Sequence, residues 1–257
     1  MPGKQYSENY QIPYFETDIK GELTLASLVN ILILASEHQL NALNVGEATM
    51  HALNLGWVVT QYQMKITRMP KVDEKVRIVT EAESYNKYFC YRNFWLYDEA
   101  GNECVFVQSI FVMMSYETRS MVQVVPEIMV PFESSEIKGS KRFPRIKKID
   151  PEQVTTKEYR VRYFDIDGNQ HVNNVHYFEW MLDALDYDFL TTHRVSSVNI
   201  RYGHEIQYGQ MTQSMVEQLI VDDIITTRHK VAVDDLSAAE AEITWKERWV
   251  ERVGFED

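Results

Sequence analysis

Apolar residues recur at helical spacing in two separate stretches of the chain. In residues 23–40, LTLASLVNILILASEHQL, this spacing is set by Leu25, Leu28, Val29, Leu32 and Ala35. In the second half the same spacing is set by Val175, Phe178, Met181, Leu182 and Leu185. The pattern predicts two amphipathic helices, with Leu28 and Phe178 on their buried faces.

Beyond each predicted helix the apolar residues alternate with period two, which is typical of strands with one buried face. In the first half the alternating runs are residues 57–67, 74–82 and 102–115. In the second half they are residues 194–202, 211–221, 224–233 and 241–250. Turn-forming residues such as 98–102, DEAGN, separate them. The pattern therefore predicts long antiparallel strands after each helix.

The chain also repeats its own opening. The segment 14–18, YFETD, returns as 163–167, YFDID, and the segment 18–21, DIKG, resembles 165–168, DIDG. Each half then reads as a strand, a long helix and several antiparallel strands. Such a helix is best buried if the sheet curls around it, so we predict an α+β double hot-dog fold. The predicted parts are an N-terminal repeat at 1–135, a basic linker at 136–150 and a C-terminal repeat at 151–257.

Composition narrows the kinds of partner that the chain can have. Its 257 residues are 45% hydrophobic, enough for sizeable cores, and its net charge of −12 disfavours binding to nucleic acid. The linker is a local exception, with basic residues at Lys138, Lys141, Arg142, Arg145, Lys147 and Lys148. This run is either a solvated linker or a docking patch for an acidic partner.

The sequence shows neither a targeting signal nor enough cysteines for a disulfide framework. The first residues lack the features of a secretory signal, and no stretch approaches about 18 apolar residues, so we expect a cytoplasmic protein without a membrane span. Cys90 and Cys104 are too few for a disulfide framework, and we interpret both as small buried side chains.

Hydrogen-bonding side chains gather in residues 163–177, YFDIDGNQHVNNVHY, just before the second helix. Asp167, Asn169 and His171 occur at every second position, so an extended loop would place them on one side. Turn formation and capping by Asn173 or Asn174 explain the other polar residues. They do not explain a histidine there, which favours a catalytic loop.

This stretch, DIDGNQHVNNVHYFEWMLDAL, resembles the signature of the acyl-acyl carrier protein (acyl-ACP) thioesterases. The resemblance implies a double hot-dog fold over nearly the whole chain and hydrolysis of fatty acyl-ACP. It also implies a catalytic group of Asp167, Asn169, His171 and Glu205. Plant members often carry a cysteine directly after this glutamate, but here Ile206 takes that place. Attack by water is therefore favoured over a cysteine nucleophile.

The first half serves as an internal comparison for this group. Aligned on the Asp-Ile-x-Gly segments, Asn169 and His171 correspond to Glu22 and Thr24, and Glu205 falls opposite Lys71. The first half thus lacks a comparable set of groups. We expect one active site in the second half, with the first half shaping the pocket for the acyl chain.

Several alternatives stay open from the sequence. Either Glu205 or Asp167 could be the base that acts with His171, while Asn169 donates its amide and backbone N–H groups of residues 173–175 hold the oxyanion. No metal or cofactor is expected, and a zinc pair of His171 and His176 is disfavoured. Acyl-CoA could replace acyl-ACP, and a hydratase or a non-catalytic acyl-binding protein would use the same fold. Chain length and a possible homodimer are also open.

Overall fold

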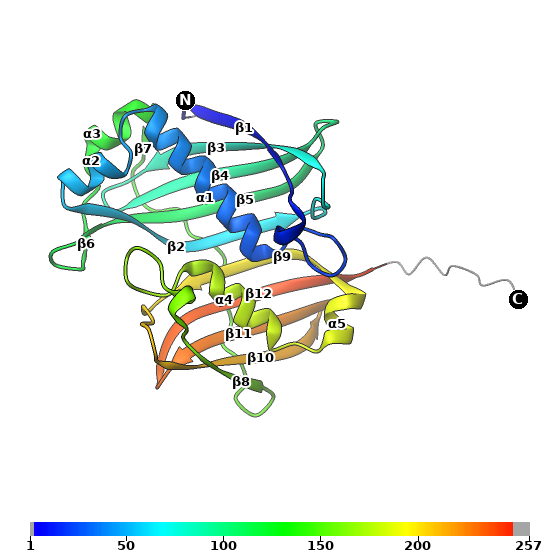
Figure 1. The fold of residues 1–257 in the computed structure, drawn as a ribbon. Coiled ribbons are helices and arrows are strands. Elements are labelled where there is room, and N and C mark those ends of the chain that lie inside the picture. Colours follow the sequence, from blue (N-terminus) through cyan, green and yellow to red (C-terminus); the bar gives the residue numbers. More distant parts are fainter. Residues whose placement is uncertain (1–2, 249–257) are drawn as a thin grey trace, which may run out of the picture.

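The computed structural model describes residues 3–248, which form two halves that share one continuous sheet (Figure 1). The first half contains β1 Gln5–Gln11, η1 Tyr14–Glu16, α1 Leu25–Ala42, α2 Glu47–Ala52, β2 Leu55–Ile66, β3 Lys75–Tyr85, β4 Phe89–Asp98, β5 Glu103–Ser115, β6 Met121–Val122, α3 Pro126–Met129, η2 Val130–Phe132 and β7 Ser135–Glu136. The second half contains β8 Thr155–Arg160, η3 Tyr163–Asp165, α4 Asn174–Asp183, α5 Tyr187–Thr192, β9 His193–Tyr202, β10 Met211–Val221, β11 Ile224–Val233 and β12 Leu236–Glu247.

The sheet runs in the order β1-β3-β4-β5-β2-β9-β12-β11-β10-β8. All neighbours along this path are antiparallel, and β2 and β9 join the two halves. At this junction the paired residues run from Gln61 opposite Arg201 to Lys65 opposite Ser197. In Figure 1, α1 lies across the first-half strands and α4 across the second-half strands, on the same side of the sheet. The two helices also contact each other.

Both predicted helices form, although Leu185 lies beyond the end of α4, and each helix begins at a capping residue. The Thr24 hydroxyl accepts the Ser27 N–H at 3.1 Å before α1, and the Asn173 side chain accepts the Val175 N–H at 3.2 Å before α4. The side chains of Leu28 and Phe178 are fully buried, as predicted.

The double hot-dog prediction is confirmed, since a long sheet curves around one helix in each half. The predicted strand runs lie within or close to β2, β3, β5, β9, β10, β11 and β12, whereas β4 was not singled out. Trp249 and Val250, the end of the last predicted run, lie outside the described residues, as do the outer ends of the predicted repeats. None of the helices in residues 3–248 is long and apolar enough to cross a membrane.

Matching backbone hydrogen bonds show how the two halves correspond. Before α1 the Asp18 N–H donates to Glu22 O at 2.8 Å, and before α4 the Asp167 N–H donates to His171 O at 3.0 Å. Each bond closes the turn that leads into its helix. The counterpart of His171 is therefore Glu22, and the prediction that it would be Thr24 is wrong.

A second pair of bonds fixes the position of Glu205. Leu23 N–H donates to Pro70 O and Val172 N–H donates to Ile206 O, each at 2.8 Å. The correspondences are Asn169 with Lys20, His171 with Glu22 and Glu205 with Met69. The predicted matches with Glu22, Thr24 and Lys71 are wrong because aligning the Asp-Ile-x-Gly segments shifted the first-half loop by two residues. With these corrected counterparts, the first half still does not carry the combination of Asn, His and Glu that Asn169, His171 and Glu205 form in the second half.

The first-half counterpart of the histidine has a structural partner. Both oxygens of Glu22 accept hydrogen bonds at 2.7 Å from the guanidinium of Arg248, at the end of β12. The two side chains are less than one-fifth exposed. A bidentate pair of this kind ties the end of the second half to the turn before α1.

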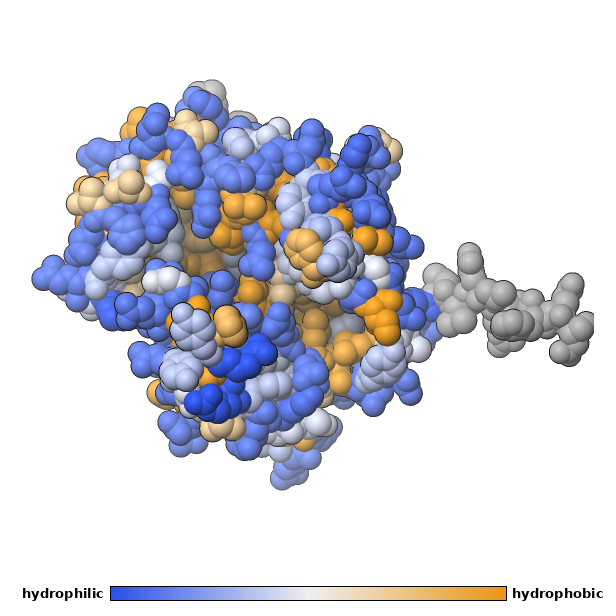
Figure 2. All heavy atoms as spheres, viewed as in Figure 1, coloured by the Kyte–Doolittle hydropathy of each residue, from blue (hydrophilic) through white to orange (hydrophobic). Residues whose placement is uncertain are grey.

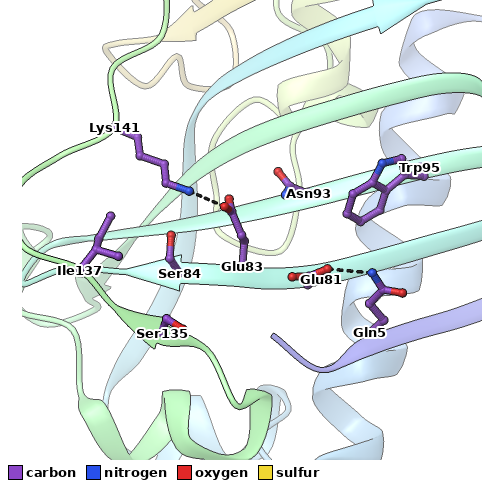
Figure 3. Close-up of a pocket in the computed structure, with 9 residues that line it drawn as sticks. All are labelled: Gln5, Glu81, Glu83, Ser84, Asn93, Trp95, Ser135, Ile137 and Lys141. Carbon is purple, nitrogen blue, oxygen red and sulfur yellow. Dashed lines mark hydrogen bonds and ion pairs between the residues drawn. The ribbon is translucent and has the colours of Figure 1, made fainter. Parts of the chain in front are cut away.

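Residues 137–154 contain no helix or strand and cross the face of the sheet that is turned away from α1 (Figure 1). The Asn86 side chain donates to Gly139 O at 2.6 Å, and that of Asn199 donates to Pro144 O at 2.8 Å. Lys141 donates to Glu83 at 2.5 Å, beside a surface pocket of about 480 Å³ (Figure 3). The segment is thus attached to strands of both halves. The predicted limits of the two repeats stay a prediction.

Phe178 tests the predicted core of the second half. Replacing it by alanine should lower the free energy of unfolding by about 3–5 kcal/mol, because the side chain is fully buried under α4. Denaturant titration followed by circular dichroism measures this loss. Phe164, which is 84% exposed, is the matched control, and Phe164→Ala should change stability by about 0.5 kcal/mol or less. Equal losses in the two variants would contradict this assignment of the core.

Candidate active site

A tight loop before α4 positions Asp167 and His171. Besides the bond from Asp167 N–H to His171 O, the Gln170 N–H donates to Asp167 O at 3.0 Å. Gln170 has a φ of 68°, and its counterpart Gly21 has a φ of 69°. This left-handed residue turns the chain so sharply that residues 167 and 171 face each other across the loop.

His171 lies between two carboxylates. Its Nδ1 is 3.8 Å from Asp167 Oδ1, and its Nε2 is 4.0 Å from Glu205 Oε1. Nδ1 is also 3.1 Å from the carbonyl oxygen of Val172. Because a carbonyl oxygen only accepts, this contact places the proton of a neutral imidazole on Nδ1. Nε2 is then left as an acceptor that faces Glu205.

Glu205 reaches this position through the segment that follows β9. The buried Ile206 uses its carbonyl oxygen to hold the Val172 N–H, which brings Glu205 next to the loop. Just before it, the Gly203 N–H donates to Ala238 O at 2.8 Å. A Cβ on Gly203 would lie 2.7 Å from a backbone oxygen, so only glycine fits this close approach.

Asn169 is exposed at the tip of the loop. Its backbone N–H donates to Asp167 Oδ1 at 2.8 Å, while its side-chain amide has no hydrogen-bond partner among residues 3–248. The four predicted side chains, those of Asp167, Asn169, His171 and Glu205, all line one cavity. The structure therefore brings the predicted set together and leaves one amide able to donate to a bound molecule.

The cavity has a volume of about 860 Å³ and extends mainly into the first half. Its apolar walls come from α1, α2, β2, β4, β5 and the α3–η2 region, and include Val29, Ile33, Met50, Val59, Phe111, Met129 and Phe132. Figure 2 shows this face of the molecule hollowed near its middle, with apolar side chains visible inside the hollow and mostly polar ones around it. Such a cavity can hold an extended apolar chain.

Two arginines that the sequence did not single out also line this cavity. Arg92 is buried on β4, where its Nη1 donates to Gln39 at 2.6 Å and Thr80 at 2.8 Å, and burial lowers its pKa to about 10. Arg119, from the turn after β5, pairs with Glu205. Neither lies in a recognisable motif, so only the fold reveals them.

The start of α4 offers fewer free N–H groups than predicted. The Asn173 N–H donates to Asp165 O at 2.9 Å, and the Val175 N–H is held by the Asn173 side chain. The N–H of Asn174, which also lines the cavity, has no partner among the described hydrogen bonds of residues 3–248. Only this one of the three predicted groups is able to contribute to an oxyanion site.

The cysteines and the second histidine lie apart from this chemistry. Cys90 is buried in the cavity wall, where burial raises its pKa to about 12, and burial also raises the pKa of Cys104. A protonated thiol is a poor nucleophile. His176 instead contacts Glu179 at 2.8 Å, and this contact raises its pKa. Within residues 3–248 no three His, Cys, Asp or Glu side chains are placed to hold a metal ion.

Comparison with known families divides the chain into two matched parts. Residues 3–132 match the family model of the acyl-ACP thioesterase N-terminal domain, and residues 148–247 match that of the C-terminal domain. The resemblance found in the loop sequence thus extends over most of the chain.

Plant proteins are among the similar curated relatives. The chain is 26% identical over 245 residues to a chloroplastic oleoyl-acyl carrier protein thioesterase of Coriandrum sativum, an alignment that covers 88% of this chain and 66% of the plant protein. It is 27% identical over 227 residues to a chloroplastic palmitoyl-acyl carrier protein thioesterase of Gossypium hirsutum, covering 83% and 55%. The chain spans about two thirds or less of the length of these relatives.

Solved structures are similar over almost their full length. A crystal structure from Lactobacillus plantarum, provisionally described as an oleoyl thioesterase, is 42% identical with a TM-score of 0.92, covering 95% of this chain and 97% of that one. The 12:0-ACP thioesterase from Umbellularia californica is 18% identical with a TM-score of 0.83, covering 95% and 98%. The second likeness supports the fold alone.

The raised pKa values of the thiols are testable without an activity assay. In the native protein both thiols should react with Ellman's reagent about a hundredfold or more slowly than in urea, because burial disfavours the thiolate. In urea both Cys90 and Cys104 should react fast, and the absorbance reached there gives the signal expected for two free thiols per chain. A native thiol that reacts at the denatured rate would contradict the buried, protonated state.

Proposed function

The chain belongs to the acyl-ACP thioesterase family, and we propose that it hydrolyses the thioester of fatty acyl-ACP, releasing free fatty acid and holo-ACP. The observation that carries this proposal is the placement of Asp167, His171 and Glu205 together on the wall of a cavity that is also lined by many apolar side chains. The polar set suits thioester chemistry, and the cavity suits an acyl chain.

The 4.0 Å between His171 Nε2 and Glu205 Oε1 is too long for a direct hydrogen bond, but one water can bridge such a gap. We propose that this water is the nucleophile. Nε2 is free to accept a proton because Nδ1 faces the Val172 carbonyl. His171 then receives the proton as the water attacks the thioester carbon, and Glu205 orients the water.

The other two residues complete the reaction. The unpartnered Asn169 amide donates to the thioester oxygen as it becomes negative, and the Asn174 N–H at the positive end of α4 adds to this stabilisation. Asp167 holds the Asn169 backbone and lies on the Nδ1 side of His171, where its charge stabilises the imidazolium. The imidazolium finally returns its proton to the departing thiolate.

A cysteine nucleophile does not fit this site. Ile206, which stands where plant members often have a cysteine, is fully buried, and the thiol of Cys90 has a pKa of about 12. Direct attack by water is therefore the mechanism that we propose.

Product analysis separates this proposal from its rivals. Purified protein is incubated with acyl-ACPs of graded chain length and with the matching acyl-CoAs, and released thiol and free acid are measured. Faster hydrolysis of acyl-CoA than of acyl-ACP would mean that CoA is the preferred carrier. A hydrated enoyl thioester as product would indicate a hydratase, and binding without thiol release would indicate a non-catalytic protein.

The cytoplasmic location and the homodimer stay predictions.

The four polar residues should each be needed for turnover. Asp167→Ala, Asn169→Ala, His171→Ala and Glu205→Ala should lower kcat by about 10²–10⁴-fold, because each removes a proton acceptor, an orienting charge or an oxyanion donor. Steady-state thiol release from acyl-ACP measures this loss. The exposed first-half residues Lys20 and Lys71 are the controls, and their alanine variants should keep wild-type turnover. The site is misplaced if His171→Ala stays active while a control variant loses turnover.

The basic linker is the candidate docking surface for an acidic carrier protein. Arg142, Lys147 and Lys148 are exposed, whereas Lys141 is already paired with Glu83. Reversing those three charges to glutamate should raise KM for acyl-ACP by about tenfold at low salt, less at high salt. KM for an uncharged acyl thioester, the control substrate, should not change. Equal KM values for acyl-ACP before and after the reversal would contradict the docking role and mean that the segment only links the two halves.

A further inference from the structure

Among residues 3–136, Arg119 is the charged residue whose side chain pairs with one of the four polar side chains Asp167, Asn169, His171 and Glu205. Its Nη2 donates a hydrogen bond to Glu205 Oε2, across 86 residues of sequence. Both residues line the cavity. No other Lys or Arg side chain within residues 3–248 is paired with Glu205.

The turn that carries Arg119 is firmly built. Arg119 has a φ of 47°, a left-handed conformation that is unfavourable for a residue with a Cβ. Its N–H donates to Ser115 O at 2.9 Å, and the Ser115 N–H donates to Ser120 O at 3.0 Å. Thr118 adds a bond from its N–H to the Ser115 hydroxyl at 3.3 Å. These bonds hold the strained residue in one conformation.

Neighbouring elements clamp the same turn from the side. The Tyr116 N–H donates to Asn54 O at 3.1 Å, and its ring stacks on His51 with centroids 4.9 Å apart. Tyr116 also covers Gly56, where a Cβ would lie 2.8 Å from the phenol oxygen. Arg119 therefore extends from a platform that is fixed to α2 and β2.

The two oxygens of Glu205 have different surroundings. Oε2 accepts from Arg119, while Oε1 faces Nε2 of His171 at 4.0 Å. Glu205 follows β9 in a segment without regular structure, and its side chain is 35% exposed. Without a partner, such a carboxylate would sample several rotamers in solvent. The arginine thus selects the rotamer in which the other oxygen faces the histidine.

We infer that Arg119 is a positioning residue for hydrolysis and that the active site is incomplete without this contribution from the first half. The inference rests on the proposed function. A solvent-exposed ion pair adds little to folding stability, so a purely structural role would leave turnover nearly unchanged. A positioning role instead lowers kcat, because small displacements of an orienting group slow the chemical step.

The test compares Arg119→Met with Arg77→Met, a matched change at an exposed first-half arginine of β3 that does not line the cavity. With acyl-ACP as substrate, Arg119→Met should lower kcat by about 10–100-fold and change KM by about threefold or less. Its melting temperature should match that of Arg77→Met. Arg119→Lys should restore part of the loss, since a lysine keeps the charge. Arg119→Met with the kcat of Arg77→Met would overturn the inference.

A double-mutant cycle shows whether Arg119 acts through Glu205. In a Glu205→Gln background, Arg119→Met should cause no further loss of kcat. Losses that multiply would mean that the arginine acts elsewhere, and the inference would fail. Wild-type protein that is inactive on every acyl thioester would overturn the proposed function as well. Active wild type with an unaffected Arg119→Met would overturn only the role of the arginine.

Discussion

The pairing of β2 with β9 is the constraint on which the rest of the molecule depends. These antiparallel strands turn two similar halves into one sheet, so that the loop before α4 opens onto a cavity whose walls come mostly from the other half. Further bonds secure this arrangement, including the bidentate pair of Glu22 with Arg248. A site assembled from two halves requires such a fixed junction, since its groups must stay within a fraction of an ångström.

The two halves share a backbone frame but differ in chemistry. The same turn precedes α1 and α4, yet it carries Glu22 in one half and His171 in the other. The glutamate is used to bind Arg248, whereas the histidine faces the cavity. Helix length differs as well: α1 has 18 residues and α4 has 10. The longer helix lines the cavity along several turns, and the shorter one buries Phe178 and Met181 in the core of the second half.

Periodicity predicted the helices and most strands because burial of one face requires apolar residues at a regular spacing along the sequence. It also located the polar loop, since Asp167, Asn169 and His171 stand close together along the chain. The alignment of the halves failed because short segments rich in Asp and Gly match in more than one register, and only the hydrogen bonds select the right one. Arg119 escaped notice because its contact with Glu205 depends on how distant strands meet.

The cavity wall comes largely from the first half of the chain, whereas Asp167, Asn169, His171 and Glu205 come from the second. Wall residues such as Cys90 and Tyr91 lie on β4, so substitutions there alter the shape of the cavity without replacing any of these four side chains. The turn with Arg119 limits this separation, because it belongs to the first half yet its arginine pairs with Glu205. Two similar halves that carry different side chains thus give this architecture two partly independent places for change.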